Sequence, residues 1–280
     1  MREHEHQHQR YHLPRGLRYS TLAEREEFYS REFDFTRVAG WFWDARDALN
    51  TVYAVVIGRH THIFKKEFAA DIKEPILIDE YKSYEDVRKL ILRFLPEGVY
   101  YDRNHYKSLR ACERCRTQRK NCWGCKNFLG QELAFDLDPE NVTCPIHGTL
   151  AQKMRRHQGL AFCAREFEMV KEECAKLYEE LERRFADLRI TYSGRGMHIH
   201  VMDEEAKKMS KRERTRLARK LDDEGFLIDE WVTAGEMRLI RLPFSLHGMV
   251  SRVVIPLEKT ALANFDPVTN EKCKPNFIRN

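Results

Sequence analysis

The sequence predicts a mixed α/β fold of the α+β kind, in which central β-sheets are flanked by helices. Short runs rich in β-branched residues, such as TVYAVVIG at 51–58, predict strands. Stretches with apolar residues at steps of three or four, such as 160–186, predict helices. These elements alternate without a regular βαβ repeat, which favours mixed sheets over one parallel sheet. With 280 residues, of which 42% are hydrophobic, the chain can bury a sizeable core.

The first hundred residues are predicted to hold an aromatic-rich helical region, short strands and one capped helix. Ser83 can cap the first turn of that helix, Asp86 stands at its third position, and Pro96 follows its end. The elements predicted here are helical structure over 20–50, strands over 51–58, 62–69 and 75–81, a helix over 83–96 and a strand over 98–102.

The rest of the chain is predicted to continue with a strand that ends in two acids and a long amphipathic helix. A glycine turn between two strands comes next, and then a basic helix that ends at Gly225, a residue typical of the position after a helix C-terminus. The elements predicted here are a strand over 132–138, a helix over 160–186, strands over 188–193 and 197–201, a helix over 209–225, and strands over 227–233 and 251–257.

A single domain is predicted over 20–280, preceded by a disordered start over 1–19 that is polar and rich in histidine. The start has no apolar signal-peptide core, and no stretch approaches the roughly 20 apolar residues of a membrane span. We therefore expect a cytoplasmic protein, where disulfides are rare. The eight cysteines then predict a zinc-binding insert at 108–128 and a second metal motif at 144–166.

Asp136 and Asp138 stand at alternate positions of the apolar strand ELAFDLD (132–138). Alternate strand residues point to the same face, so two carboxylates emerge side by side. Each raises the pKa of the other unless a cation lies between them. Mg²⁺ usually takes one or two carboxylates together with substrate phosphates, so this pair predicts a divalent metal site.

Two later segments add a third acid and several groups that bind phosphate. One is a glycine-broken turn followed by a strand, and the other is an acid followed by basic and polar residues. The residues are Ser193, Arg195 and His198 in YSGRGMHIHV (192–201), and Asp229, Arg241, Ser245 and His247 in IDEWVTAGEMRLIRLPFSLHG (228–248). Three acids with such groups indicate a site for nucleotidyl transfer.

These segments resemble those of the catalytic small subunit of the archaeo-eukaryotic DNA primases. ELAFDLD is similar to the family's ELVFDID, and YSGRGMHIHV is similar to its SG-R-G-x-H turn and strand. IDEWVT with LIRLPFSLHG is similar to LDxxVT with LLRLPxSLHG, and HIFKKEFA resembles REFAF. The matching pieces run in the family order from about 60 to 257.

The resemblance implies a primase-polymerase core that uses two catalytic divalent ions, Mg²⁺ or Mn²⁺. It implies that three acids hold these ions and that the glycine turn lets backbone N–H groups approach phosphate. The implied ligands are Asp136, Asp138 and Asp229. The implied nucleotide-binding residues are Ser193, Gly194, Arg195, His198, Arg241, Ser245, His247 and Lys66, which stands at the Arg of REFAF.

The cysteines predict structural zinc. Two CxxC pairs can close a tetrahedral four-thiolate site, and they are Cys112 with Cys115 and Cys122 with Cys125. Cys144, His147 and Cys163 form a second motif, with His157 or Glu166 as a fourth ligand, where the resemblance places the family's zinc. Joint binding of one ion by Cys122, Cys125, Cys144 and His147 is the open alternative.

The helix predicted over 209–225 is crowded with basic residues. Arg212, Arg216 and Arg219 lie at steps of four and three and therefore share a face, where they can contact template phosphates. A solvated surface without a partner is the alternative.

The site and the resemblance together predict a DNA primase catalytic subunit that makes short RNA or DNA primers on single-stranded DNA and releases pyrophosphate. The expected partners are single-stranded DNA, nucleoside triphosphates and a large primase subunit, with no membrane. One alternative keeps the fold, as a primase-polymerase or a gap-filling repair polymerase of the end-joining type. Another is a non-catalytic zinc protein that binds single strands, although three clustered carboxylates are hard to explain there.

Overall fold

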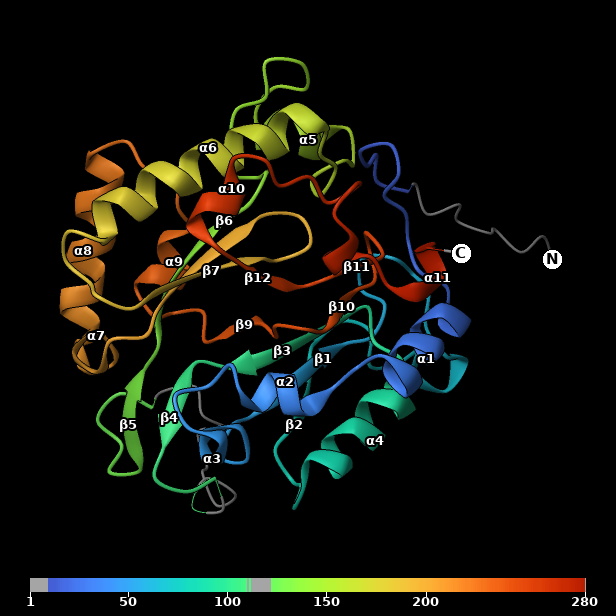
Figure 1. The fold of residues 1–280 in the computed structure, drawn as a ribbon, viewed down its shortest axis with the longest axis horizontal. Helices are drawn as coiled ribbons and strands as arrows, with labels where there is room; N and C mark the ends of the chain where they lie inside the picture. Colours follow the sequence, from blue (N-terminus) through green and yellow to red (C-terminus); the bar gives the residue numbers. More distant parts are fainter. Residues whose placement is uncertain (1–9, 110, 112–121, 280) are drawn as a thin grey trace.

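The computed structural model describes residues 10–109, 111 and 122–279, which form two four-stranded sheets surrounded by helices (Figure 1). The first sheet has the strand order β2-β1-β3-β9 and the second has the order β12-β7-β8-β6. The pairs β4-β5 and β10-β11 stand apart, and every described strand pair is antiparallel. The predicted class, with central sheets flanked by helices, is confirmed.

The first sheet combines distant parts of the chain. Its strands are β1 (Tyr53–Val56), β2 (Ile76–Ile78), β3 (Gly98–Asp102) and β9 (Leu239–Arg241). The edge strand β9 comes from the C-terminal part of the chain and lies beside β3 (Figure 1). Tyr100 pairs with Arg241 in this register, so a residue of the third predicted segment lies next to the N-terminal sheet.

The second sheet carries the predicted acid pair. Its strands are β6 (Leu133–Leu137), β7 (Leu188–Tyr192), β8 (Met197–Val201) and β12 (Ile255–Leu257). Asp136 on β6 lies opposite His198 on β8. The long helix α6 (Ala164–Leu181) covers β6 and β8 with the apolar face that its sequence period predicts.

The remaining elements are shorter. The helix α4 (Tyr84–Phe94) has the predicted capping box, in which the Ser83 and Asp86 side chains accept from each other's backbone N–H groups. The others are α1 (Leu22–Arg31), α2 (Phe35–Ala39), α3 (Ala45–Ala48), η1 (Lys66–Phe68), β4 (Asn104–Tyr106), β5 (Phe128–Gln131), α5 (Leu150–Arg155), α7 (Glu204–Lys208), α8 (Lys211–Asp223), α9 (Glu230–Thr233), β10 (Leu246–His247), β11 (Arg252–Val253), α10 (Lys259–Leu262), η3 (Glu271–Cys273) and α11 (Asn276–Arg279).

Two predicted strands are wrong. The segment 62–69 contains the 3₁₀ helix η1 and no strand. The reason is that the chain turns back directly after β1, where His62 has a φ of 55° and its N–H donates to the Gly58 carbonyl. The segment 227–233 forms the short helix α9, because the Asp229 carboxylate accepts from the N–H groups of the first turn. The basic stretch 209–225 also begins later than predicted, because Ser210 caps α8.

Residues 10–19, which the sequence assigned to a disordered start, pack against the rest of the molecule. The His12 N–H donates to the Gln158 side chain at 2.8 Å, and the Gly16 carbonyl accepts from Arg252 at 3.0 Å. Within the described ranges, no helix has both the length and the apolar character that crossing a membrane requires.

Candidate active site

The three predicted segments meet around one cavity of about 260 Å³ between the two sheets. The second sheet supplies Asp136 and His198, and the first supplies Tyr100 and Arg241. The predicted residues that line the cavity are Asp136, Asp138, Ser193, Arg195, His198, Asp229, Arg241 and His247. The structure therefore brings together most of the predicted site, from segments that extend from Asp136 to His247 in the chain.

The three acids converge because Asp136 lies on β6, Asp138 follows directly after its end, and a backbone hydrogen bond holds the third acid. The Asp229 N–H donates to the Asp136 carbonyl at 3.0 Å. The side chain of Asp229 uses one oxygen, Oδ1, to accept from Trp231 and Val232, which leaves Oδ2 for the cavity. The acid triad is thus fixed by main-chain contacts that do not depend on a metal.

The carboxylates have strongly perturbed acidities. Burial and the neighbouring Asp136 raise the pKa of Asp138 well above its usual value. Burial also raises the pKa of Asp136, but His198, whose Nε2 lies 3.3 Å from Asp136 Oδ1, outweighs it and leaves that pKa lowered. Burial followed by Asp136 raises the pKa of Asp229. A divalent cation would relieve this repulsion, so the oxygen donors present fit Mg²⁺ or Mn²⁺.

The glycine turn between β7 and β8 lies directly against the acids. The Gly196 N–H donates to Ser193 Oγ at 3.1 Å, and the Ser193 N–H donates to the Gly196 carbonyl at 3.0 Å. A Cβ on Gly196 would come within 2.2 Å of the Leu137 carbonyl and 2.3 Å of Asp138 Oδ1. Gly194 has a φ of 112°, so this turn requires glycine at both positions.

Arg195 and Arg241 face the cavity with unused hydrogen-bonding capacity. Arg195 Nη2 donates to both oxygens of Glu140 at 2.7 Å, while its buried Nε has no partner. Arg241 Nη2 donates to the Tyr100 hydroxyl at 2.7 Å, and its buried Nη1 has no partner. Unpartnered buried donors that line a cavity indicate an anionic ligand.

Two histidines complete this wall. Burial, together with Arg241 and Arg195, lowers the pKa of His247 well below its usual value, so the ring is neutral. The Nδ1 atoms of His198 and His247 are buried without partners. The neutral His247 imidazole, beside two guanidinium groups, can donate to a phosphate oxygen without adding further positive charge.

Three predicted nucleotide-binding residues do not line the cavity. Lys66 is exposed, Ser245 donates to the Leu242 carbonyl at 2.6 Å, and Gly194 contributes through the turn. The cavity is also lined by His60, Tyr100 and Glu140, which were not predicted as site residues. Only Glu140 had a usable signal, because it stands two residues after Asp138.

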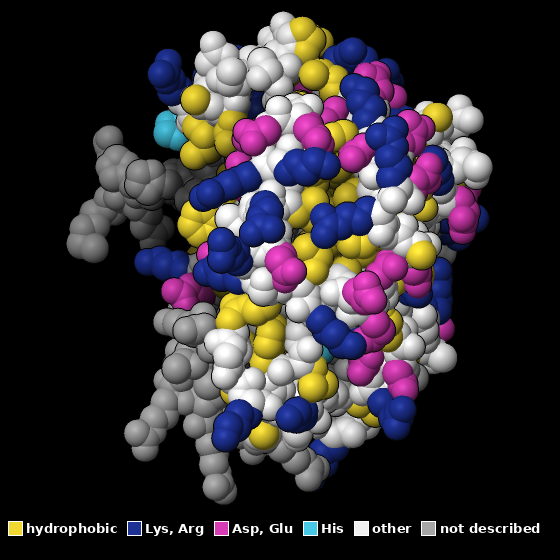
Figure 2. Space-filling view, turned by 90° about the vertical axis from the view of Figure 1, so that its left-hand side faces the viewer, with side chains coloured by type: hydrophobic (Ala, Val, Ile, Leu, Met, Phe, Trp, Pro, Cys, Tyr) yellow, Lys and Arg dark blue, Asp and Glu magenta, His cyan; other side chains and the backbone are white. Residues whose placement is uncertain are grey.

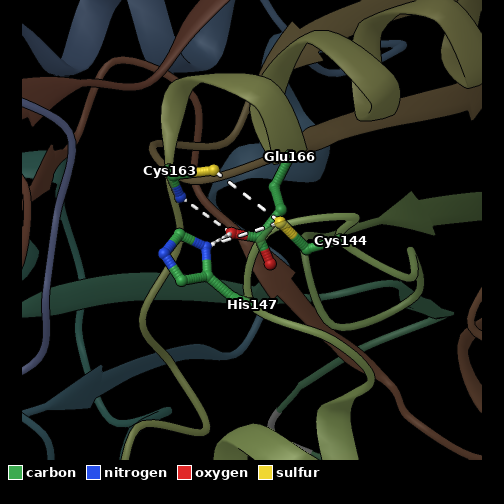
Figure 3. A group of neighbouring side chains, drawn as sticks. All are labelled: Cys144, His147, Cys163 and Glu166. Carbon is green, nitrogen blue, oxygen red and sulfur yellow. Dashed lines mark hydrogen bonds and ion pairs between the residues drawn. The ribbon is translucent and has the colours of Figure 1, made fainter.

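Cys144, His147, Cys163 and Glu166 form a second cluster, in which the ligand atoms lie within 4.8 Å of one another (Figure 3). Cys144 Sγ lies 3.4 Å from His147 Nδ1 and 3.9 Å from Cys163 Sγ. The first two residues follow β6, and the last two lie at the start of α6. This donor set fits Zn²⁺, and the cluster includes Glu166 and not His157.

The other predicted zinc site is only partly described. Cys112 and Cys115 lie outside the described residues, while Cys122 is buried and Cys125 is exposed. The second cluster includes neither Cys122 nor Cys125, so the described residues do not form the mixed site.

The predicted template residues Arg212, Arg216 and Arg219 are exposed on α8, and this side of the molecule shows basic side chains interspersed with acidic ones (Figure 2). Arg214 is different, because it is fully buried and donates to the carbonyls of Gln131 and Glu132. The buried arginine anchors α8 beside β6, and α8 also packs on α9, which begins after Asp229.

Known proteins offer clear relatives, although no family model matches the chain. An Archaeoglobus fulgidus protein described as an uncharacterized DNA primase small subunit-like protein is 52% identical over 92% of this chain and 91% of its own length. DNA primase small subunits from Pyrobaculum aerophilum and Pyrococcus abyssi are 28% and 29% identical over 63% and 72% of this chain.

The chain spans 65% of the Pyrobaculum protein and 49% of the Pyrococcus protein. Among solved structures, the polymerase domain of Mycobacterium tuberculosis Ligase D in complex with DNA has a TM-score of 0.42 and 11% identity, and the match covers 92% of this chain and 85% of that domain.

Proposed function

The chain belongs to the small-subunit family of archaeo-eukaryotic DNA primases, and on that premise we propose that it is a template-directed nucleotidyltransferase that makes primers on single-stranded DNA. The observation that carries this proposal is the cavity in which three partly buried acids face Arg195, Arg241 and two histidines. Carboxylates at one end and anion-binding groups at the other match a metal-bound triphosphate.

Each residue has a distinct role in this proposal. Asp136, Asp138 and Asp229 would hold two divalent ions, Mg²⁺ or Mn²⁺, which when bound polarise the attacking hydroxyl and neutralise charge on the triphosphate. Arg195 and Arg241 bind and orient the phosphates. Further phosphate contacts would come from Ser193, His198 and His247, which line the cavity beside the turn at Gly194.

The expected partners belong to the same proposal. Single-stranded DNA would be the template, nucleoside triphosphates the substrates, and a large primase subunit the protein partner. The exposed arginines of α8 support the template contact, because α8 packs on the helix that begins after Asp229.

Zinc would serve structure and not catalysis. Bound by Cys144, His147, Cys163 and Glu166, it would tie the loop after β6 to the start of α6. Elemental analysis of Cys163→Ser should show one zinc equivalent fewer than the wild type. The control Cys174→Ser, in the core face of α6, should lose none. Equal zinc in wild type and Cys163→Ser would contradict the site.

The test of the function is de novo synthesis on unprimed single-stranded DNA, with ribo- or deoxynucleotides and with Mg²⁺ or Mn²⁺. We expect labelled products that disappear with Asp136→Ala and persist with Asp222→Ala on the exposed end of α8. Extension of gapped duplexes without any unprimed synthesis would favour a repair polymerase. Equal activity of Asp136→Ala would overturn the assigned site.

A further inference from the structure

Glu97 is a buried carboxylate that bonds to one short loop. It is 4% exposed and accepts from the His60 N–H, the Thr61 N–H and the Thr61 hydroxyl. Its Oε1 also lies 2.6 Å from His60 Nδ1. A buried charge is costly unless it is compensated, and here the described compensation comes from the loop that carries His60.

His60 lines the catalytic cavity. The Gly248 N–H donates to the Glu97 backbone carbonyl at 2.7 Å, which places the main chain of Glu97 beside the segment that carries His247. Because Nδ1 of His60 is engaged by Glu97, Nε2 is the ring nitrogen left for a ligand. A base that is oriented by a carboxylate at a cavity wall is a recognised catalytic arrangement.

The loop does not need the contact between His60 Nδ1 and Glu97 Oε1 to keep its shape. Arg25 is fully buried and donates to the carbonyls of Ile57 and Ile63 and to the Thr61 hydroxyl. These bonds fix the loop on both sides of His60. The His60–Glu97 contact therefore orients the imidazole ring, which a purely structural loop would not require.

We propose that His60, oriented by Glu97, is the proton donor to the departing pyrophosphate. This inference rests on the proposed nucleotidyl transfer. The primer hydroxyl oxygen forms the new bond to the α-phosphorus and releases its proton to water, and the bond from that phosphorus to the oxygen that bridges it to the β-phosphorus breaks. The bridging oxygen takes the proton from His60 Nε2, and the neutral ring, whose side chain is 33% exposed, regains a proton from water.

The experiment varies the basicity of the leaving group. Nucleotides with a CF₂, oxygen, CHF or CH₂ bridge between the β- and γ-phosphorus release, in that order, pyrophosphate or bisphosphonates of increasing basicity. Single-turnover rates with wild type, His60→Gln and Glu97→Gln then give the dependence on leaving-group basicity. His12→Gln, an exposed histidine outside the cavity, is the matched control.

A proton donor makes the rate less sensitive to leaving-group basicity. We expect His60→Gln to lose roughly 10²-fold with the most basic leaving group and much less with the least basic one. Glu97→Gln should change the slope in the same direction by a smaller amount, and His12→Gln should match the wild type.

Parallel slopes for wild type and His60→Gln, with only the KM raised, would overturn the inference and leave His60 as a phosphate contact. That result leaves the proposed function standing. A wild-type protein that incorporates no nucleotide under any condition overturns the proposed function, and the inference with it.

Discussion

Asp138 is the residue on which stability and catalysis should conflict most directly. Burial and Asp136 raise its pKa in the folded protein above the usual 3.8. A group whose pKa is raised on folding stabilises the fold below its unfolded pKa, and that contribution is lost as the pH rises. At neutral pH, without metal, Asp138 therefore weakens the fold.

Asp138→Asn should abolish synthesis and raise the melting temperature of the metal-free protein at pH 7. Each ~1 kcal/mol of stabilisation corresponds to roughly 2–4 °C for a large domain. Thermal melts in chelator at pH 7 and pH 4 provide the measurement, and the gain should shrink at pH 4. The exposed Asp222→Asn serves as the control. A lower melting temperature for Asp138→Asn at pH 7 would contradict the assignment.

Glu140 is hydrogen-bonded to the Arg195 guanidinium, the group that would bind the triphosphate in the proposed reaction. Both its oxygens accept from Arg195 Nη2 at 2.7 Å. Glu140→Gln removes a competing anion, so we predict several-fold tighter binding of inorganic triphosphate and a lower KM for nucleotide. Calorimetric titration and steady-state kinetics measure the two effects, with Glu172→Gln on the exposed face of α6 as the control. A higher KM would show that Glu140 holds Arg195 in place.

Single residues also show what the sequence could reveal about the site. Asp136 and Asp138 were predictable because strand alternation is a local rule. His60 and Tyr100 were not, because their place in the cavity depends on the pairing of β3 with β9 and on the contact between Glu97 and Gly248. Such long-range contacts leave no periodic signal in the chain.

Among the elements, α8 offers the clearest test of a template surface. Arg212, Arg216 and Arg219 are exposed, so their replacement by Glu should leave the fold intact. Each lost phosphate contact lowers the log–log salt slope of single-strand binding by roughly 0.7. Titrations at several salt concentrations measure that slope. The control is Lys176→Glu on α6 combined with Arg183→Glu just beyond its C-terminus. Equal slopes for the α8 variant and the wild type would make α8 a solvated surface.

The elements that the sequence predicted wrongly share a cause. The runs 62–69 and 227–233 contain apolar and β-branched residues, which favour strands. In the structure, the turn at His62 and the Asp229 cap override that preference. Longer elements such as α4 and α6 were predictable, because several turns of regular spacing outweigh one local cap.

Across the whole molecule, Gly248 joins the N-terminal helices to the catalytic segment. Its N–H donates to the Glu97 carbonyl, and its own carbonyl accepts from the Ser20 N–H at 2.8 Å. A Cβ at this position would come within 2.9 Å of Glu97 Cα, a backbone atom that cannot easily move.

Gly248→Ala should therefore cost ~1–3 kcal/mol of folding free energy. It should also reduce synthesis more than that loss of stability explains, because Glu97 would be displaced. Denaturant unfolding and synthesis below the melting transition separate the two effects. Gly40→Ala, whose Cβ would have only ordinary contacts of 3.6 Å, is the control. A Gly248→Ala variant that is fully active and as stable as the wild type would contradict the proposed role of Gly248 as the link between the two parts of the molecule.

β9 is the last strand of the first sheet to be synthesised, and this affects the order in which the parts of the protein can fold. While the ribosome is still adding residues before Leu239, β3 has an open edge and the cavity lacks the wall that carries Arg241. Asp136 and Asp138 already exist at that time, but the proposed phosphate pocket is incomplete without Arg241. We therefore expect a nascent or truncated chain that ends before β9 to be inactive. The unpaired edge of β3 should also make such a chain prone to aggregate.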